Sequence, residues 1–210
     1  HELQLLADGS YLLLSYRPRS GVDLSAYNGD ADATVLDAVI QRLSPGGGLL
    51  WEWSSADHID PAETGRWWGN PVLNPEPYDT THINSVEPLA GGDYLISLRH
   101  TDAIYRIDGQ SGAIEWKLGG TPRPESLSIL GDPHGSYPLG GQHDARQLAD
   151  GTLSVYDNGT ARPATSTGPG WSPGAARSRS ASGSASSAAS SSASSRAPAS
   201  ATALRRSSAS

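Results

Sequence analysis

Three histidines and one arginine are the residues of this sequence best suited to do chemistry. His1, His82 and His143 each open a similar stretch, HELQLLADGSYLLL, HINSVEPLAGGDYLI and HDARQLADGTLSVY. The turn glycine follows the histidine by eight residues in the first and third stretches and by ten in the second. Arg99 ends the apolar run of the second stretch. Imidazole can act as nucleophile or general acid near neutral pH, and a guanidinium fork suits sulfate or phosphate oxygens. The set therefore predicts an anion site with a nucleophile or proton donor.

The element that must position these residues is clearest in residues 82–120. Apolar residues gather at 94–96 and alternate with polar ones at 104–108 and 114–118, with a glycine-containing turn at 109–112. Alternation that is interrupted every eight to twelve residues by Gly, Asp or Asn is typical of short antiparallel strands. The stretch therefore predicts a four-stranded meander of the size of one propeller blade.

The repetition of this unit predicts an all-β fold, an incomplete β-propeller of four-stranded antiparallel blades. Residues 1–161 would hold about two to three blades. The inner strands of a propeller face its axis, so equivalent positions of successive blades converge there. We therefore expect His1, His82 and His143 to lie close together.

The segments between the repeats are assigned by composition. Residues 1–17 are expected to form the inner strands of one blade, residues 18–34 a loop, and residues 35–43 a further strand, since Ser-Pro-Gly follows directly. The stretch 51–53 would close this blade. Residues 54–81 form a long insertion, and loops of that length in compact domains are usually functional or act as lids.

Four further side chains are candidates for substrate binding. His58 and His100 stand beside expected turns and could line the mouth of the channel, or could be structural. Trp67 and Trp68 in the insertion could stack on an aromatic ligand or pack against the loop itself. A three-histidine metal site is an alternative for the main cluster. Because a neighbouring Arg99 disfavours a bound cation, we expect no metal.

The last quarter of the chain has a different composition. Residues 162–210 contain 30 Ser or Ala, six Arg and no acidic residue. Such a segment buries too little apolar surface to offset the entropy of the chain, so we expect a disordered tail. The abrupt change of composition is also what a shifted reading frame in a GC-rich gene produces, and translation of the DNA in the other frames tests that interpretation. With no Met at its start, the sequence is also expected to be cut at the N-terminus.

Charge and composition exclude several classes of protein. All 22 acidic residues precede the tail, and the first 161 residues carry nine Lys or Arg, so the folded part is strongly acidic. The basic residues of the tail lack aromatic interleaving, and we expect no nucleic-acid partner. No apolar stretch approaches the length of a membrane span, and without cysteine there is no disulfide or thiolate chemistry.

Five motifs in order, HINSV, SLRH, IDGQSGAIEWKLGG, QHDAR and YDNG, resemble the arylsulfotransferase family of β-propeller proteins. The resemblance covers about residues 1–160. It implies a six-bladed, exported protein, periplasmic or extracellular, that moves a sulfuryl group from a phenol sulfate to a phenol without a cofactor or nucleotide donor. It also implies that His143 forms a sulfohistidine, that His82 and Arg99 hold the sulfonate oxygens, and that His1 is a further active-site histidine. Either His82 or His1 would protonate the leaving oxygen.

The sequence departs from the best-known family members after its Gln-His pair. Those enzymes have Thr-Ala-Trp-like sequence there, whereas this chain has Asp144-Ala145-Arg146, which resembles a broader branch of the family. Two or three blades leave sheet edges open, so we expect this stretch alone to be inactive. Two alternatives remain. One is a non-catalytic propeller that binds a ligand or partner. The other is a quinone-cofactor dehydrogenase, which needs a calcium site and a broad aromatic floor that His82, Arg99 and His143 do not supply.

Overall fold

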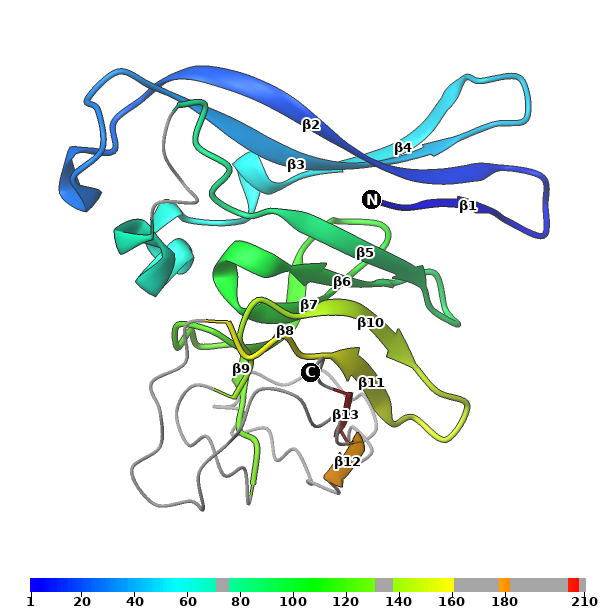
Figure 1. The fold of residues 1–210 in the computed structure, drawn as a ribbon. Helices are drawn as coiled ribbons and strands as arrows, with labels where there is room; N and C mark the ends of the chain where they lie inside the picture. Colours follow the sequence, from blue (N-terminus) through cyan, green and yellow to red (C-terminus); the bar gives the residue numbers. More distant parts are fainter. Residues whose placement is uncertain (71–75, 131–137, 161–177, 182–203, 208–210) are drawn as a thin grey trace, which may run out of the picture.

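The structure is predominantly β and consists of three sheets that follow one another along the chain (Figure 1). It is a computed structural model that describes residues 1–70, 76–130, 138–160, 178–181 and 204–207. The first sheet lies at one end, the second in the middle and the third at the other end, as Figure 1 shows. The expected all-β class is confirmed.

The first sheet is the four-stranded antiparallel meander expected for the first repeat. Its strands are β1 (Leu3–Leu5), β2 (Tyr11–Val22), β3 (Ala33–Leu43) and β4 (Leu49–Ser54). A short 3-10 turn, η1 (Ser25–Tyr27), lies in the connection between β2 and β3.

The expected loop at 18–34 is wrong in its first part, because β2 continues through Val22 and pairs with β3. Pro18, which suggested the loop, pairs with Leu36 inside the ladder. β1 covers β2 only as far as Leu13, so the other edge of β2 is unpaired at Pro18. A proline on an edge loses no ladder hydrogen bond, and the strand tolerates it.

The second sheet contains the expected meander of residues 82–120 and one additional strand. Its members are β5 (Ile83–Pro88), β6 (Tyr94–Leu98), β7 (Ala103–Ile107), β8 (Ile114–Gly119) and β9 (Ser126–Leu127). The 3-10 turn η5 (Arg99–Thr101) connects β6 to β7. β9 pairs in parallel with β8 and follows it after a short proline-containing connection.

The third sheet begins with the expected hairpin. β10 (His143–Gln147) pairs antiparallel with β11 (Leu153–Tyr156). Two short strands from the last quarter of the chain, β12 (Ser178–Ala181) and β13 (Leu204–Ser207), complete the sheet, with β13 parallel to β11. The rest of residues 162–210 lies outside the described residues, so the disordered tail stays a prediction.

Two apolar layers hold the sheets together, because the strands of the second sheet present alternate side chains to its two neighbours. Ile96 belongs to the cluster shared with the first sheet, and the adjacent Leu95 belongs to the cluster shared with the third. The first sheet contributes Leu12, Ile40 and Trp53, and the third contributes Ala145, Leu153 and Val155.

The insertion of residues 54–81 packs on the second sheet. It contains the 3-10 segments η2 (Ser55–Asp57) and η3 (Pro61–Gly69). From η3, Glu63 forms a buried ion pair with Lys117 of β8, with 2.7 Å between Glu63 Oε2 and Lys117 Nζ. The hydroxyl of Tyr105 donates to the same carboxylate at 3.0 Å. Removing one partner of such a pair leaves an uncompensated buried charge, so these contacts hold the insertion firmly in place.

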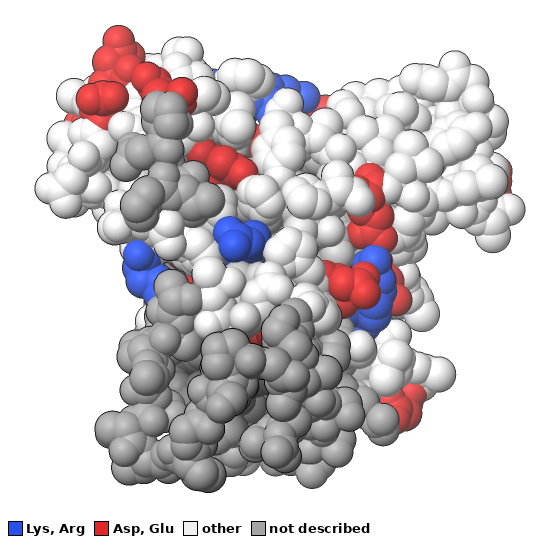
Figure 2. Space-filling model, in the orientation of Figure 1, with Lys and Arg blue, Asp and Glu red and all other residues white. Residues whose placement is uncertain are grey.

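On the face drawn in Figure 2, the described residues form no basic stripe. Lys and Arg side chains are scattered there, with acidic side chains among them. Within the described part of the chain, no helix is long and apolar enough to cross a membrane.

Candidate active site

Three strand starts bring the predicted histidines together. His1 precedes β1, His82 directly precedes β5, and His143 is the first residue of β10. The Nε2 atoms of His1 and His82 are 3.1 Å apart, and the ring centroids of His1 and His143 are 6.3 Å apart. The histidines at the shared repeat position thus form one cluster, as the repeat predicts.

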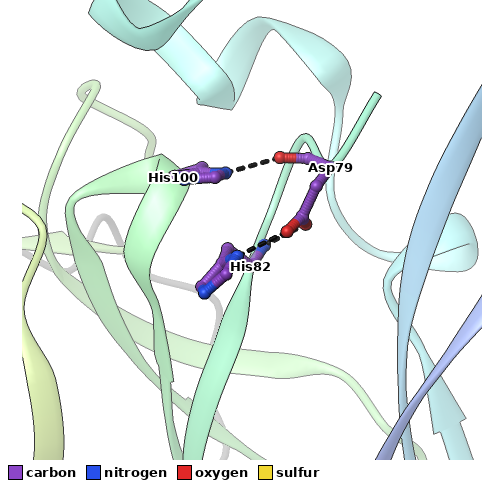
Figure 3. Close-up of side chains that lie close together, drawn as sticks. All are labelled: Asp79, His82 and His100. Atoms are coloured by element: carbon purple, nitrogen blue, oxygen red, sulfur yellow. Dashed lines mark hydrogen bonds and ion pairs between the residues drawn. The ribbon is translucent and has the colours of Figure 1, made fainter. Parts of the chain in front are cut away.

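Asp79, at the end of the insertion, orients His82 (Figure 3). His82 adopts a left-handed backbone conformation with φ of 48°, and its backbone N–H donates to Asp79 Oδ1 at 2.9 Å. The second carboxylate oxygen of Asp79 contacts His82 Nδ1 in a short hydrogen bond. A carboxylate oxygen accepts here, so Nδ1 carries the proton and Nε2 points toward His1.

His100 lies behind His82 and is buried, with 4.7 Å between the two ring centroids. Its Nδ1 donates to the backbone carbonyl of Asp79 at 2.5 Å, and its Nε2 accepts from Arg99 Nη1 at 2.8 Å. This pair of contacts requires the neutral ring, since Nε2 must keep its lone pair. Burial agrees, because it is the largest cause that lowers the pKa of His100 to about 4.

Arg99 provides the positive charge of the site. Its guanidinium carbon lies 4.7 Å from the centre of the Trp67 ring, in a cation–π arrangement. Burial lowers the pKa of Arg99, yet a guanidinium stays charged at neutral pH. Among the described residues, no carboxylate lies within ion-pair distance of Arg99. A half-buried cation without a carboxylate is suited to an anionic ligand.

His143 is held by neutral groups. Its Nδ1 lies 3.1 Å from the carbonyl oxygen of Gly141 and 3.0 Å from the side-chain nitrogen of Asn158. The Asn158 NH₂ group can only donate, and the Gly141 carbonyl oxygen accepts from it at 2.5 Å. When His143 Nδ1 also donates to that carbonyl, Nε2 keeps a free lone pair. Burial lowers the pKa of His143, with smaller contributions from Arg99 and His82. The ring is therefore neutral at pH 7, as a nucleophile must be.

Buried polar contacts fix the loop before His143. The Gln142 side-chain nitrogen donates to the backbone carbonyl oxygens of Leu98 and Ala103 at 3.0 and 2.9 Å. The backbone carbonyl of Gln142 accepts from the Asn84 side-chain nitrogen at 2.7 Å. The HINS and QH motifs therefore contact each other, although 58 positions separate Asn84 from Gln142.

Asp102 connects this loop to the insertion. Its buried carboxylate accepts from Arg66 Nε at 2.7 Å, from Trp67 Nε1 at 2.9 Å and from the backbone N–H of Gly141 at 2.6 Å. Asp102 thus joins Trp67 of the insertion, on whose ring Arg99 lies, to the loop that carries His143.

Two of the four predicted substrate-binding residues lie away from the histidine cluster. His58 stacks on Trp53, with centroids 5.3 Å apart and planes 6° apart, beside the turn between β7 and β8. Trp68 stacks on Tyr27 at 4.7 Å and donates to the carbonyl of Pro61. The structure does not bring His58 or Trp68 to the histidine cluster, since each packs against its own neighbourhood. His100 does reach the cluster, but as the buried partner of Arg99 rather than at a channel mouth.

Trp67 reaches the cluster in a different role from the expected one. It is buried, and Arg99 and Arg66 lie over its ring at 4.7 and 5.4 Å. The ring supports the Arg99 guanidinium instead of offering a face to an aromatic ligand.

Two groups of side chains in the described residues have metal-like spacing, but both are occupied by other contacts. Asp79, His82 and His100 are joined by hydrogen bonds that use both nitrogens of His100. Asp93, Asp108 and Glu115 form the second group, and Arg106 pairs with its Asp93 and Glu115. Hydrogen-bond donors already satisfy these atoms, so neither group is arranged for a cation.

Asp79 and Asn158 contact histidines of the cluster, and the sequence did not single out either of them for a role. Asp79 stands three positions before His82 within a segment that reads as loop, and Asn158 stands within a turn-like Asp-Asn-Gly run. The signal for Asp79 would have been its place three positions before a histidine with a positive φ. The sequence shows the spacing but not the φ.

Comparison with known proteins gives one family. The model of the arylsulfotransferase (ASST) family matches residues 1–190. No curated protein matches the chain. Because the match spans most of the sequence and includes every residue of the cluster, the chain belongs to the arylsulfotransferase family.

Proposed function

We propose that this protein transfers a sulfuryl group from a phenol sulfate to a phenol through a sulfohistidine on His143. The observation that carries the proposal is the convergence of a neutral His143 with Arg99, a cation that has no described carboxylate within ion-pair distance. A sulfate ester brings the negative charge that Arg99 lacks, and His143 Nε2 offers the lone pair that must attack sulfur.

In the first step, His143 Nε2 attacks the sulfur of the donor. An N–S bond forms as the S–O bond to the aryl group breaks, and the electron pair of that bond goes to the leaving oxygen. Arg99 stabilises the charge on the equatorial oxygens, and a donor of this kind contributes about 10²–10³-fold in rate. A protonated imidazole, His82 or His1, supplies the proton to the leaving phenol.

In the second step, the acceptor phenol takes the place of the first. The imidazole that gave its proton now removes the phenol proton, the phenol oxygen attacks sulfur, and the N–S bond breaks to restore neutral His143. Two half-reactions through one covalent intermediate predict ping-pong kinetics.

The remaining expectations follow from the resemblance and the arrangement of the sheets. We propose that the sheets are blades of a six-bladed propeller, which the common meeting point of His1, His82 and His143 supports. The partners would be small aryl sulfates and phenols, with no cofactor. We place the protein in the periplasm or outside the cell, because the family members that it resembles are exported.

The test is donor cleavage with detection of the intermediate. Because this stretch alone is expected to be inactive, the test uses the complete six-bladed protein that would contain it. That protein is incubated with 4-nitrophenyl sulfate and phenol, nitrophenolate is followed, and protein quenched with donor alone is weighed intact. We expect nitrophenolate release and a gain of about 80 Da, the mass of one SO₃ group, located on His143 and lost in His143→Ala. Gln110→Ala, in the exposed turn between β7 and β8, serves as the control.

A different result would favour the other class. Binding of aryl sulfate that depends on Arg99, without nitrophenolate release or mass gain, would replace the transferase by a non-catalytic binding propeller.

A further inference from the structure

The insertion of residues 54–81 ends at the histidine cluster, and one of its residues contacts two members of the cluster. The side chain of Asp79 contacts His82 Nδ1, and its backbone carbonyl accepts from His100 Nδ1 (Figure 3). His100 in turn accepts from Arg99 Nη1. One residue of the insertion therefore contacts His82 directly and is connected to Arg99 through His100.

The directions of these hydrogen bonds fix the proton positions. Oxygen atoms accept in both contacts of Asp79, so His82 and His100 each carry a proton on Nδ1. The two rings then differ. His100 uses its Nε2 to accept from Arg99 and stays neutral, while His82 directs its Nε2 into the cluster toward His1.

A carboxylate against Nδ1 gives His82 a property that its neighbours lack. An ionised carboxylate in this position holds the ring in one orientation and stabilises its imidazolium form. His1 has no carboxylate against its ring among the described residues, and His143 is backed by a carbonyl and an amide. Of the three converging histidines, His82 is the one built to hold and release a proton from Nε2.

We propose that Asp79 is the positioning residue that makes His82 the proton donor to the leaving phenol. The inference rests on the proposed sulfuryl transfer and assigns a proton path within it. His82 Nε2–H gives its proton to the departing aryl oxygen, and the remaining neutral ring keeps its Nδ1 proton on Asp79. In the second half-reaction, the same Nε2 takes the proton of the acceptor phenol.

The Asp79→Asn variant tests the proposal with little change of shape. Asn retains an oxygen that can accept from the His82 backbone N–H, as Asp79 Oδ1 does. Its other terminal atom becomes an NH₂ group, which can only donate, so His82 Nδ1 must become the acceptor. The ring then takes the opposite tautomer and loses the carboxylate that favours its cation, the effect known for the Asp→Asn change of the serine protease triad.

The kinetic readout is the dependence of rate on the leaving group. Phenolate is a poor leaving group and needs the proton, whereas 4-nitrophenolate leaves with little help. We expect Asp79→Asn to slow transfer from phenyl sulfate by about 10²-fold or more, and transfer from 4-nitrophenyl sulfate by less than about tenfold. Asp60→Asn is the matched control, because Asp60 caps η3 in the same insertion and Asn is an equally good cap.

A second readout does not depend on turnover. In ¹⁵N NMR spectra of the neutral ring, we expect the proton of His82 on Nδ1 in the wild-type protein and on Nε2 in Asp79→Asn. Equal slowing of both donors, or an Nε2 proton on neutral His82 in the wild-type protein, would overturn the proposal. A wild-type protein that releases no nitrophenolate would overturn the proposed transfer and the proton role with it, while the NMR result would still decide whether Asp79 fixes the ring.

Discussion

The segments that lead into β5 and β10 place two histidines at the same repeat position and treat them differently. His82 directly precedes β5 and His143 opens β10. Both strand starts contain a residue with a positive φ, 48° at His82 and 55° at Asp144. The positive φ falls on the histidine itself before β5 and on the residue after the histidine in β10. The two rings also differ in the groups that contact them.

Behind His82 is the carboxylate of Asp79, and behind His143 are the Gly141 carbonyl and the Asn158 side chain. A carboxylate favours the charged ring, whereas burial among neutral groups favours the neutral ring. The comparison teaches that the repeat supplies the position of each histidine, and that the connecting segment supplies its proton chemistry. A proton donor and a nucleophile can arise from one repeated motif in this way.

Arg99→Ala should have the largest effect on the rate of transfer. Arg99 would stabilise the charge on the sulfonate oxygens, whereas His82 and His143 each take part in one proton or bond transfer. We expect a loss of about 10²–10³-fold in kcat/KM, by the same factor for phenyl sulfate and 4-nitrophenyl sulfate. The equal factor follows because the guanidinium would act on the sulfonate oxygens and not on the leaving oxygen. Steady-state kinetics with both donors measures it.

Arg17→Ala is the matched control for Arg99→Ala. Arg17 pairs with Glu52 on the surface of the first sheet, at 2.8 Å, and an exposed pair contributes less than about 1 kcal/mol. A donor-dependent loss in Arg99→Ala would show that Arg99 assists the leaving group, and the division of roles between Arg99 and His82 would fail.

Asn158→Asp should make His143 resemble His82. A carboxylate beside Nδ1 raises the pKa of His143, which burial holds below its ordinary value in the wild-type protein. Because only the neutral ring attacks sulfur, the rate increases as pH rises through this pKa. We expect the acid limb of the pH–rate profile to move to higher pH, with about tenfold lower rate on that limb for each unit of pKa change and recovery above it.

The measurement is kcat/KM for 4-nitrophenyl sulfate as a function of pH, a donor that needs little acid assistance. Asn28→Asp, in the distant connection between β2 and β3, controls for the added charge. An unchanged acid limb in Asn158→Asp would mean that His143 does not titrate in this step, and the proposed nucleophile would lose its support.

Local patterns predicted the sheets and the positions of the histidines. The alternation of β7 and β8 and the recurring His-to-Gly spacing are features of neighbouring residues, so they are visible in the sequence. β2 was cut short at Pro18 because the sequence does not show that the opposite edge of the strand is unpaired there.

The contacts of individual side chains could not be predicted from local sequence patterns, because they involve residues distant in the sequence. For His100 and Trp68, the sequence left a ligand-binding role and a structural role open, and both pack against residues distant in the sequence. The contact of Asp79 with His82 goes with a left-handed backbone at His82, a feature that residue type alone does not indicate for histidine. The role proposed for Asp79 therefore depends on the insertion, which has little sequence periodicity.

The repeat also predicts which apolar residues matter for stability. Tyr11 and Tyr94 each stand two positions after a turn glycine, and the ladders place Leu3 opposite Leu13 as they place Val86 opposite Ile96. Tyr94 stacks on Trp51 at 4.5 Å. Leu3 is 66% exposed, whereas Val86 is fully buried between the first and second sheets.

Val86→Ala should therefore destabilise the protein more than Leu3→Ala, although the two positions are equivalent in the repeat. We expect Val86→Ala to lower the free energy of unfolding by about 2 kcal/mol, because it leaves a cavity between two sheets. Leu3→Ala should change it by less than about 0.5 kcal/mol, as exposed substitutions do. Urea denaturation followed by tryptophan fluorescence compares them. An equal loss of unfolding free energy in Leu3→Ala and Val86→Ala would contradict this prediction. It would mean that another surface buries Leu3 in solution as the first and second sheets bury Val86.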